Sequence, residues 1–377
     1  MDTRDFLVPD NYADFHCKCG KCRHTCCDGW AVTFPREDYF HLLSVPCSPE
    51  LRRKLDTSLH LADDPTPERY AELLPNWEGH CPLQRADGLC ALQAECGEEA
   101  ISTTCRYYPR GIRTMDDDEC ACSASCERMV EMLLHRLPPM TFRRMRLSFA
   151  MPLPPRETDA ALTAETRQLR RDVVTMLQAR EVPLASRMMG IRAALVLEES
   201  GRQTSESRWA AFRAAAKVAI PPADWALRAN ILRTLMEELL ADTISMGGIA
   251  AEILPLLRGE QAGTVLQQAA GTFQADTPDW MIGTEQLMVN HVFYEGFPYG
   301  AHQERPATAV SLCAEYAVLR GTAVLYHQLH PDETALVDAI AALFRVLEHS
   351  AFGWNAAVVL EREGKAGEDV IGQIVGI

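Results

Sequence analysis

The chain has 377 residues, of which 47% are hydrophobic and 24% charged, and its formal net charge is −15. This length allows a real hydrophobic core and more than one domain, and the composition excludes wholesale disorder and low-complexity classes. The negative charge argues against a non-specific nucleic-acid binder, which needs a basic face, and favours a cationic partner.

The sequence shows no obvious membrane or export signal. No run approaches the ~18 consecutive apolar residues that a membrane-spanning helix needs. The N-terminus, which begins Met1-Asp2-Thr3-Arg4, lacks the basic start and apolar run of a secretory signal. We therefore expect a cytoplasmic protein without a membrane span.

The cysteines divide the chain. Of the fourteen cysteines, thirteen lie between Cys17 and Cys126, and the remaining one is Cys313. Thiols stay reduced in the cytoplasm, so a dense cluster indicates metal binding more readily than a disulfide framework. We expect a cysteine-rich metal domain over 1–137 and a helical domain over 138–377.

The N-terminal region is rich in turn formers such as Asp87-Gly88 and has few long periodic segments. Short helices are predicted over 36–43, 49–59 and 93–100. Such a region builds little core of its own, so a metal centre that crosslinks its loops would supply folding energy.

After Pro138-Pro139 the pattern becomes helical. Apolar residues recur at helical spacing over 224–245, with Asp224 as N-cap, and Pro278 and Pro331 mark the starts of two further helices. No series of β-branched strands is evident. The predicted fold class is therefore mainly α, with a loop-rich cysteine region packed on an all-α C-terminal domain.

The spacing of the cysteines limits which kind of metal centre they could bind. Thiolates select zinc, cuprous copper or iron–sulfur clusters. The first group ends in the adjacent pair Cys26 and Cys27, which cannot easily serve one ion, and the second group, Cys81, Cys90 and Cys105, is widely spaced. Structural zinc sites usually consist of two Cys-x2-4-Cys knuckles. An iron–sulfur cluster or two centres are therefore favoured, with zinc as the alternative.

Several stretches, taken in order, resemble the flagellin lysine-N-methylase (FliB-type) family, whose N-terminal cysteine pattern is shared with YkgJ-like cysteine-cluster proteins. The strongest are Cys-Arg-His-Thr-Cys-Cys-Asp-Gly-Trp at 22–30, Cys-Pro-Leu-Gln-Arg-Ala-Asp-Gly-Leu-Cys at 81–90, and Thr-Cys-Arg-Tyr-Tyr-Pro-Arg within 97–110. Ser-Cys-Glu at 125–127 follows, and the stretch at 285–298 resembles the family more weakly.

This resemblance implies transfer of a methyl group from S-adenosylmethionine to surface lysines of flagellin, by an enzyme that holds an iron–sulfur cluster of the 4Fe-4S type. The cysteines that match the family pattern, and are implied as metal ligands, are Cys17, Cys22, Cys26, Cys27, Cys81, Cys90, Cys105 and Cys126. The other six, Cys19, Cys47, Cys96, Cys120, Cys122 and Cys313, are additional.

The residues themselves do not identify the S-adenosylmethionine site. No Gly-x-Gly-x-x-Gly loop is present, so a doubly wound methyltransferase domain is not expected. Radical enzymes need Cys-x3-Cys-x2-Cys, whereas here Cys26 is followed directly by Cys27. The cofactor-binding candidates come from the weakly similar stretch at 285–298. Asn290 is a candidate for hydrogen bonding, and Phe293 and Phe297 are candidates for an apolar channel or for stacking on adenine.

If the product is methyl-lysine, the target amine must first lose a proton, because an ammonium with a pKa of about 10.4 has no lone pair to donate. A carboxylate or tyrosine would assist. The catalytic candidates are Glu285, Tyr294, Glu295 and Tyr299, for each of which a purely structural role is the competing interpretation. The alternative function is a non-enzymatic zinc or iron-cluster scaffold, or a redox protein, that binds a protein partner.

Overall fold

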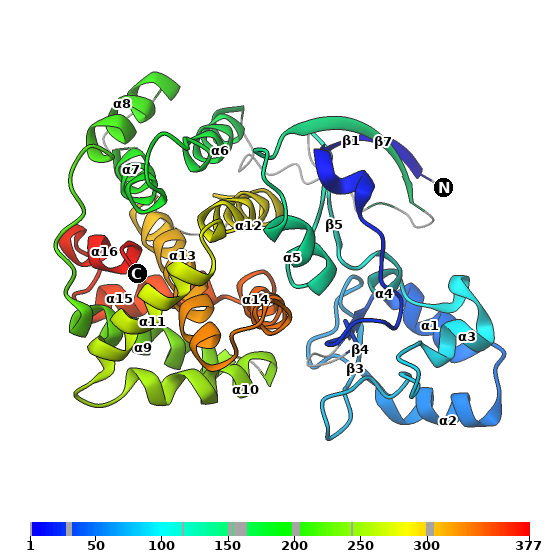
Figure 1. The fold of residues 1–377 in the computed structure, drawn as a ribbon. Coiled ribbons are helices and arrows are strands. Elements are labelled where there is room, and N and C mark those ends of the chain that lie inside the picture. Colours follow the sequence, from blue (N-terminus) through cyan, green and yellow to red (C-terminus); the bar gives the residue numbers. More distant parts are fainter. Residues whose placement is uncertain are drawn as a thin grey trace.

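A computed structural model describes residues 2–27, 32–114, 117–149, 153, 164–197, 204–242, 244–298 and 305–377. These residues form a helical body and a smaller cysteine-containing lobe beside it (Figure 1). The predicted fold class, mainly α with a loop-rich N-terminal region, is confirmed.

The cysteine-containing lobe has its own small core. Its apolar residues include Val32, Leu42, Leu55, Leu73 and Leu92, all buried. They are contributed by helices α1 (Arg36–Ser44), α2 (Pro49–Ser58) and α3 (Ala91–Cys96), and by a three-stranded sheet in the order β2 (Val32–Phe34), β4 (Ala71–Leu73) and β3 (Leu59–Leu61). The short helix α4 (Thr103–Tyr107) follows.

Residues at the helix ends explain where the helices of this lobe begin and end. Ser48 caps α2 by accepting a hydrogen bond from the Leu51 amide at 3.2 Å, and Pro49 occupies the first helical position. The segment predicted as one helix over 93–100 is divided, because Gly97 has φ of 87° and ends α3 before a 3-10 turn at Glu98–Ala100.

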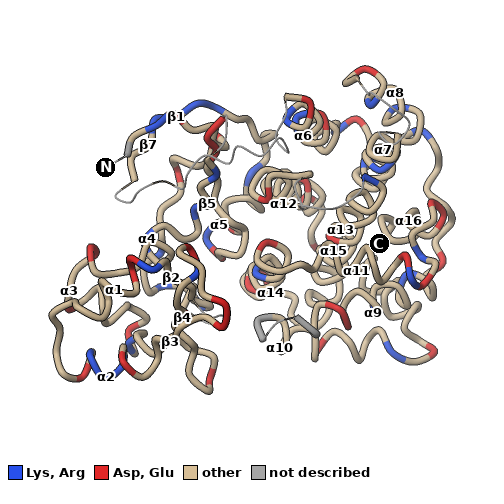
Figure 2. The backbone as a smooth tube through the Cα atoms, turned by 180° about the vertical axis from the view of Figure 1, so that it is seen from behind, with Lys and Arg blue, Asp and Glu red and all other residues tan. Residues whose placement is uncertain are grey.

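A second sheet joins the two ends of the cysteine-rich region. Its strand order is β5 (Arg110–Arg113), β6 (Glu119–Cys122), β1 (Asp2–Pro9) and β7 (Phe142–Phe149). Strand β1 is antiparallel to β7 along its whole length and parallel to β6. Basic residues mark the β1–β7 ribbon (Figure 2).

Strand β7 corrects one detail of the prediction, because it lies beyond residue 137 in the region expected to be all-α. Its sequence, Phe-Arg-Arg-Met-Arg-Leu-Ser-Phe, places Met145, Leu147 and Phe149 at alternate positions. This period of two is a strand signal. The helical part proper begins at α6 (Ala164–Leu177).

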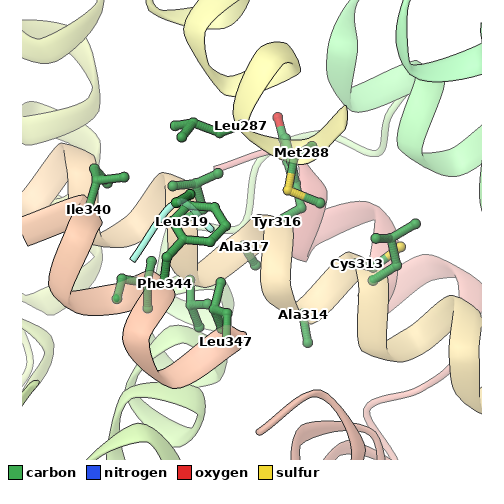
Figure 3. Packing of buried hydrophobic residues seen from close by; sticks show 14 of the residues in the cluster. Leu287, Met288, Cys313, Ala314, Tyr316, Ala317, Leu319, Ile340, Phe344 and Leu347 are labelled. Atoms are coloured by element: carbon green, nitrogen blue, oxygen red, sulfur yellow. The ribbon is translucent and has the colours of Figure 1, made fainter. Parts of the chain in front are cut away.

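The helical body packs around α13 (Arg305–Leu329), which contacts helices from both sides of it in sequence. Figure 3 shows Leu287 and Met288 gathered with Tyr316 and Phe344 in this core. The remaining helices are α5 (Glu127–Leu134), α7 (Leu184–Val196), α8 (Ser205–Ala215), α9 (Trp225–Asp242), α10 (Ile244–Ile253), α11 (Ala262–Asp276), α12 (Trp280–Tyr294), α14 (Glu333–Leu347), α15 (Phe352–Arg362) and α16 (Glu368–Val375).

The helices predicted in this body form, although α12 and α14 each begin two residues after the proline that was expected at the first helical position. Asp224 accepts a hydrogen bond from the Leu227 amide at the start of α9, and Asp332 does the same for the Ala335 amide of α14. Helix α12 begins two residues after Pro278. The stripe predicted over 224–245 is buried at Leu232, Leu235, Met236 and Leu239.

Among the described residues, α13 is long and apolar enough to cross a membrane, with a mean hydropathy of 1.2. Within the protein, however, 94% of its apolar segment is buried. A helix that is apolar all round and surrounded by other helices has the character of a core helix.

Candidate functional site

The first cysteine loop, residues 17–27, is held against α5 by charge. Lys18 Nζ binds Glu127 Oε1 at 2.7 Å and Glu131 Oε1 at 2.5 Å. The backbone amides of Arg23 and His24 donate to Glu127 Oε2 at 3.0 and 3.3 Å. Because the Glu127 side chain is buried, these four contacts together fix the path of the loop.

Helix α14 holds the other side of the same loop. Arg23 Nε lies 2.9 Å from Asp338 Oδ2, and its terminal nitrogen lies 2.8 Å from Oδ1. Arg345 donates to the backbone carbonyls of His24 and Thr25, both at 3.1 Å. The cysteine loop is therefore attached to both the α5 and α14 helices.

The second cysteine stretch folds back onto the first. The Cys81 amide donates to the Cys27 carbonyl at 2.8 Å. Further along, Gly20 and Gly88 have φ of 62° and 78°, and a side-chain carbon on Gly88 would lie 2.7 Å from the Gly20 carbonyl oxygen. This approach of two backbones requires glycine at both positions.

The thiols of the predicted ligands interact with one another. Cys26 and Cys81 donate hydrogen bonds to the Cys27 sulfur, and these bonds, that from Cys26 foremost, lower the pKa of Cys27 to about 3. Electrostatic interactions extend the group from Cys26 to Cys105 and Cys126, from Cys126 to Cys17 and Cys22, and from Cys27 to Cys90. The same kind of interaction also reaches Cys19, Cys96 and Cys122, so it does not separate the eight predicted ligands from the additional cysteines.

Three of these cysteines lie where helices begin. Cys90 precedes α3, Cys126 precedes α5, and Cys105 lies in the first turns of α4. Burial raises the pKa of Cys90 and Cys126, but backbone amides at the helix starts donate to both sulfurs and oppose that rise. A helix N-terminus favours a thiolate, the form that binds metal.

The donor set suits a soft metal centre, although it is not closed around an ion. In the described ranges, which omit 28–31, no three cysteine, histidine or acidic side chains are grouped as ligands of one metal ion. Cys17, Cys26 and Cys105 are exposed, while Cys120, Cys122 and Cys313 are buried in the main core. The ligand assignment therefore stays a prediction, with soft thiol donors in its favour.

A second cluster lies beside the cysteines, inside the protein. The buried His291 ring of α12 contacts two glutamates, with Nε2 at 3.3 Å from Glu315 of α13 and Nδ1 at 3.3 Å from Glu348 after α14. Ser123 Oγ and the Ala124 amide donate to the second Glu348 oxygen at 2.5 and 2.9 Å. We call these residues, with Ser125 and His349, the glutamate–histidine network.

The network holds a buried charge. Burial alone would lower the pKa of His291, but Glu315 foremost, and Glu348, raise it well above the usual value. His291 is thus an imidazolium between two carboxylates, and the group retains excess negative charge. Such a site favours a further cation nearby.

Two of the catalytic candidates adjoin this network at the end of α12. Burial, with Glu348 and Glu295, raises the pKa of Tyr294 above its usual range. Glu295 reaches solvent, but surrounding protein partly desolvates its carboxyl and raises the pKa to about 7, with His291 opposing the rise. A carboxyl with a pKa near 7 is suited to proton transfer at neutral pH.

Tyr108 connects the network to the cysteines. Its hydroxyl lies 3.0 Å from Ser125 Oγ, which is 2.5 Å from Ser123 Oγ and 3.1 Å from His349 Nε2. Burial and the adjacent Cys126 raise the pKa of Tyr108. Since Ser125 and Cys126 are neighbours in the chain, the two clusters form one continuous region.

Glu285, the third catalytic candidate, lies elsewhere on α12. Its carboxylate, 1% exposed, binds Arg180 through three contacts of 2.8 to 3.0 Å and Arg187 at 2.8 Å. Both oxygens are thereby used by guanidinium groups. The structure does not bring Glu285 together with Tyr294 and Glu295.

The cofactor candidates separate in the same way. Asn290 donates to the Cys122 carbonyl at 3.0 Å, next to the network. Phe293 lies between the Phe142 ring, 4.6 Å away, and the Arg170 guanidinium, 5.1 Å away. Phe297 packs against the main core. Tyr299, the fourth catalytic candidate, lies outside the described residues.

The sequence-based prediction missed Glu315, Glu348, Ser123, Ser125 and His349. They come from three separate segments, and no local motif announces them. The available signal was weak: an acidic residue within a largely apolar helix, as Glu315 is in α13, indicates a paired or functional group.

Comparison with known proteins gives a family match. Residues 171–356 match the family model described as FliB lysine N-methylase C-terminal domain. The chain is similar to the Lysine-N-methylases of Salmonella typhimurium and Salmonella choleraesuis, each 27% identical over 123 residues, which are 32% of this chain and 30% of each relative. The aligned part therefore spans less than a third of these relatives.

A third relative is the Flagellar biosynthetic protein FliU of Salmonella muenchen, 26% identical over 123 residues, which cover 32% of this chain and 72% of that protein. No solved structure matches. The matched family segment, 171–356, includes His291, Glu295, Glu315 and Glu348.

Proposed function

The chain belongs to the FliB-type lysine N-methylase family, and on this basis we propose that it is a protein-lysine N-methyltransferase. The observation that carries the proposal is that the matched segment contains the buried His291, Glu315 and Glu348 of the network and the solvent-reaching Glu295. The proposed methyl donor is S-adenosylmethionine, which supplies an electrophilic methyl group on a sulfonium.

Glu295 is the proposed base. Its carboxylate takes a proton from the lysine ammonium, and the freed Nζ lone pair forms the new bond to the methyl carbon. The methyl–sulfur bond breaks as that bond forms, and its electron pair stays on sulfur. With a pKa of about 7, Glu295 is substantially ionised at neutral pH and can still hold the proton that it receives.

The network around Glu295 supports binding of a cationic side chain. Glu315 and Glu348 carry two negative charges against the single positive charge of His291. A lysine ammonium entering beside Glu295 would offset the excess. Tyr294, kept neutral by its raised pKa, adds a hydroxyl and an aromatic face at the same helix end.

The eight predicted cysteines are proposed to hold an iron–sulfur cluster, with zinc as the alternative metal. Their soft thiol donors, the hydrogen bonds of Cys26 and Cys81 to Cys27, and the helix starts at Cys90, Cys105 and Cys126 support this assignment. The lobe has only a small hydrophobic core, and bound metal would add crosslinks between its loops. The cysteines would then fix the loop that Arg345 and Glu127 attach to the helical body.

Flagellin is the proposed protein substrate, since one relative bears the name of a flagellar biosynthetic protein and the others are named as lysine methylases. An acidic protein of net charge −15 would attract lysine-bearing surfaces. Modification before export would place the reaction in the cytoplasm, where thiol ligands remain reduced.

The test is anaerobic co-expression with flagellin, followed by mass spectrometry of flagellin lysines. The wild-type chain should produce methyl-lysine, and Glu295→Gln should reduce it at least a hundredfold, as expected when a general base is lost. Glu252→Gln is a matched control, because Glu252 lies near a histidine, His330 at 2.6 Å, but at the surface and away from the network. Unmethylated flagellin bound to the wild-type chain would instead indicate a scaffold.

A further inference from the structure

A cavity of about 490 Å³ lies outside both clusters, between the second sheet, helix α6 and the end of α12. Strand β7 contributes Phe142 and Arg144, and α6 contributes Arg167, Arg170 and Arg171. Phe293 of α12 closes one wall. Neither the cysteines nor the glutamate–histidine network line this cavity.

The described lining of the cavity is positively charged, in a chain whose net charge is −15. It has four arginines but two acids. Glu119 is taken up by Arg170, at 2.8 Å through one nitrogen, and by Arg113 at 3.2 Å. Asp117 is shared by Arg144 at 2.6 Å and Arg167 at 3.8 Å.

Arg171 adds positive charge that contributes, after Arg144, to the lowered pKa of Asp117 but forms no ion pair with either acid of the described lining. Its guanidinium donates to the neutral Gln168 Oε1 at 2.7 Å. Arg144, 51% exposed, and the exposed Arg171 lie on β7 and α6, on which Figure 2 shows basic residues. An anionic group is therefore the complement of this part of the cavity.

Apart from the polar Thr175 and Gln178, the remaining lining is apolar. Leu7, Met140 and Val174 lie with Phe142 and Phe293 along the cavity. Phe293 is flanked by Phe142 and Arg170, whereas Phe142 is itself half-buried and so presents part of its ring to the cavity. Such a wall favours a planar, apolar group of the ligand.

We propose that this cavity binds a small molecule that joins a carboxylate to a planar ring system, with the carboxylate on Arg144 and Arg171 and the ring against Phe142. S-adenosylmethionine belongs to this chemical class, and its amino group would find an acceptor in Asp117. Naming the methyl donor as the ligand rests on the proposed function, whereas the carboxylate-and-ring class rests on the cavity.

The cavity adjoins the proposed base through one arginine. Arg113 binds Glu119, which lines the cavity, and donates to the carbonyls of Phe293, at 3.3 Å, and Tyr294. These two residues immediately precede Glu295. A ligand in this cavity is therefore placed against the helix end that carries the candidate base.

The test is calorimetric titration of the purified, metal-loaded full chain with S-adenosylhomocysteine, the demethylated product of the donor. Arg144→Gln and Arg171→Gln should each weaken binding about tenfold, the loss expected for one charge-assisted hydrogen bond. Arg143→Gln is the matched control, because Arg143 is the preceding residue on the same strand but does not line the cavity. It should leave binding within about twofold of wild type.

A second probe separates the two parts of the cavity. Methylthioadenosine keeps the adenine and thioether but lacks the carboxylate, so its affinity should be unchanged by Arg171→Gln and reduced by Phe142→Ala. Equal affinity of all variants for S-adenosylhomocysteine, or no binding by the wild-type chain, would overturn the assignment of the cavity. Melting temperatures equal to wild type verify that the exposed arginine variants are folded.

Failure of this inference is distinguishable from failure of the proposed function. Methyl-lysine formed at the wild-type rate by Arg144→Gln and Arg171→Gln, with unchanged affinity for S-adenosylhomocysteine, would refute the site and leave the methyltransferase. Arginine-dependent binding without any methyl-lysine would do the reverse.

Discussion

Replacing Glu285 by glutamine should destabilise the helical body by about 3 kcal/mol, because it leaves two arginines without their shared carboxylate. The Glu285 side chain is 1% exposed and that of Arg187 is 8% exposed, so water does not replace the lost contacts. Arg180 is more exposed, at 31%, and contributes less to the penalty. Breaking a buried pair by removing one partner typically costs about 3–5 kcal/mol.

The assay is thermal unfolding followed by circular dichroism at matched metal content. For a body of this size each kcal/mol shifts Tm by about 2–4 °C, so a fall of roughly 6–12 °C is expected. Glu237→Gln is the matched control, because Glu237 also contacts two arginines, Arg233 and Arg258, at 3.4 and 3.3 Å, but is 40% exposed. Its loss should cost less than about 1 kcal/mol.

A Tm for Glu285→Gln equal to that of Glu237→Gln would refute the reasoning from burial. The same variant also distinguishes a structural from a catalytic Glu285. Methyl transfer per folded molecule should stay close to wild type, because both oxygens of Glu285 are used by Arg180 and Arg187. Loss of turnover without loss of stability would return Glu285 to the catalytic candidates.

Three further predictions concern the site. The rate of methyl transfer at limiting substrate should rise about tenfold per pH unit below pH 7 and level off above it. The reason is that the Glu295 carboxyl, with its raised pKa of about 7, loses its proton over that range. Glu295→Gln should abolish this pH dependence, and a pH dependence that survives in the variant would exclude Glu295 as the base. Cys105→Ser should lose bound metal and Cys313→Ser should keep it, since Cys313 is buried in the main core; metal analysis of both proteins decides, and metal loss from Cys313→Ser would break the division of the cysteines. Gly353→Ala should destabilise the protein by about 1–3 kcal/mol, because the new methyl group would overlap the Glu315 carboxylate; denaturant unfolding with an unchanged midpoint would contradict the packing.

Local chemistry in the sequence predicted many of the helices. The Ser48-Pro49 start of α2 and the Asp332 cap of α14 are decided by residues within one turn, so no tertiary information was needed. The sequence did not predict strand β7, because the prolines before it also fit the start of a helical domain. Strand β7 pairs with β1, which lies more than a hundred residues away in the sequence.

The site was predictable in part for the same physical reason. Eight cysteines stand out by type and spacing, and in the structure the sulfurs of three of them, Cys26, Cys27 and Cys81, are hydrogen-bonded; the ligand set itself stays a prediction. The network does not stand out, because His291 meets Glu315 and Glu348 at separations of 24 and 57 residues. A single glutamate forms no recognisable sequence motif, so these residues come together as a site only in the folded structure.

The two parts of the site share one helix. Arg345 of α14 binds the backbone of the first cysteine loop, and Glu348, three residues later, binds His291. A change in the cysteine loop would therefore be felt at the network within one helical turn. The proposed metal centre would thus be connected to the proposed methyl-transfer site without contacting the substrate.

The most direct measurement is label transfer in vitro. The protein, purified anaerobically with its metal, is incubated with flagellin and S-adenosylmethionine labelled on the transferred methyl group, and flagellin peptides are sequenced by mass spectrometry. Labelled methyl groups on lysine, absent when Glu295→Gln replaces the wild-type chain, are the predicted result. Flagellin that binds the metal-loaded protein and acquires no label would contradict the account.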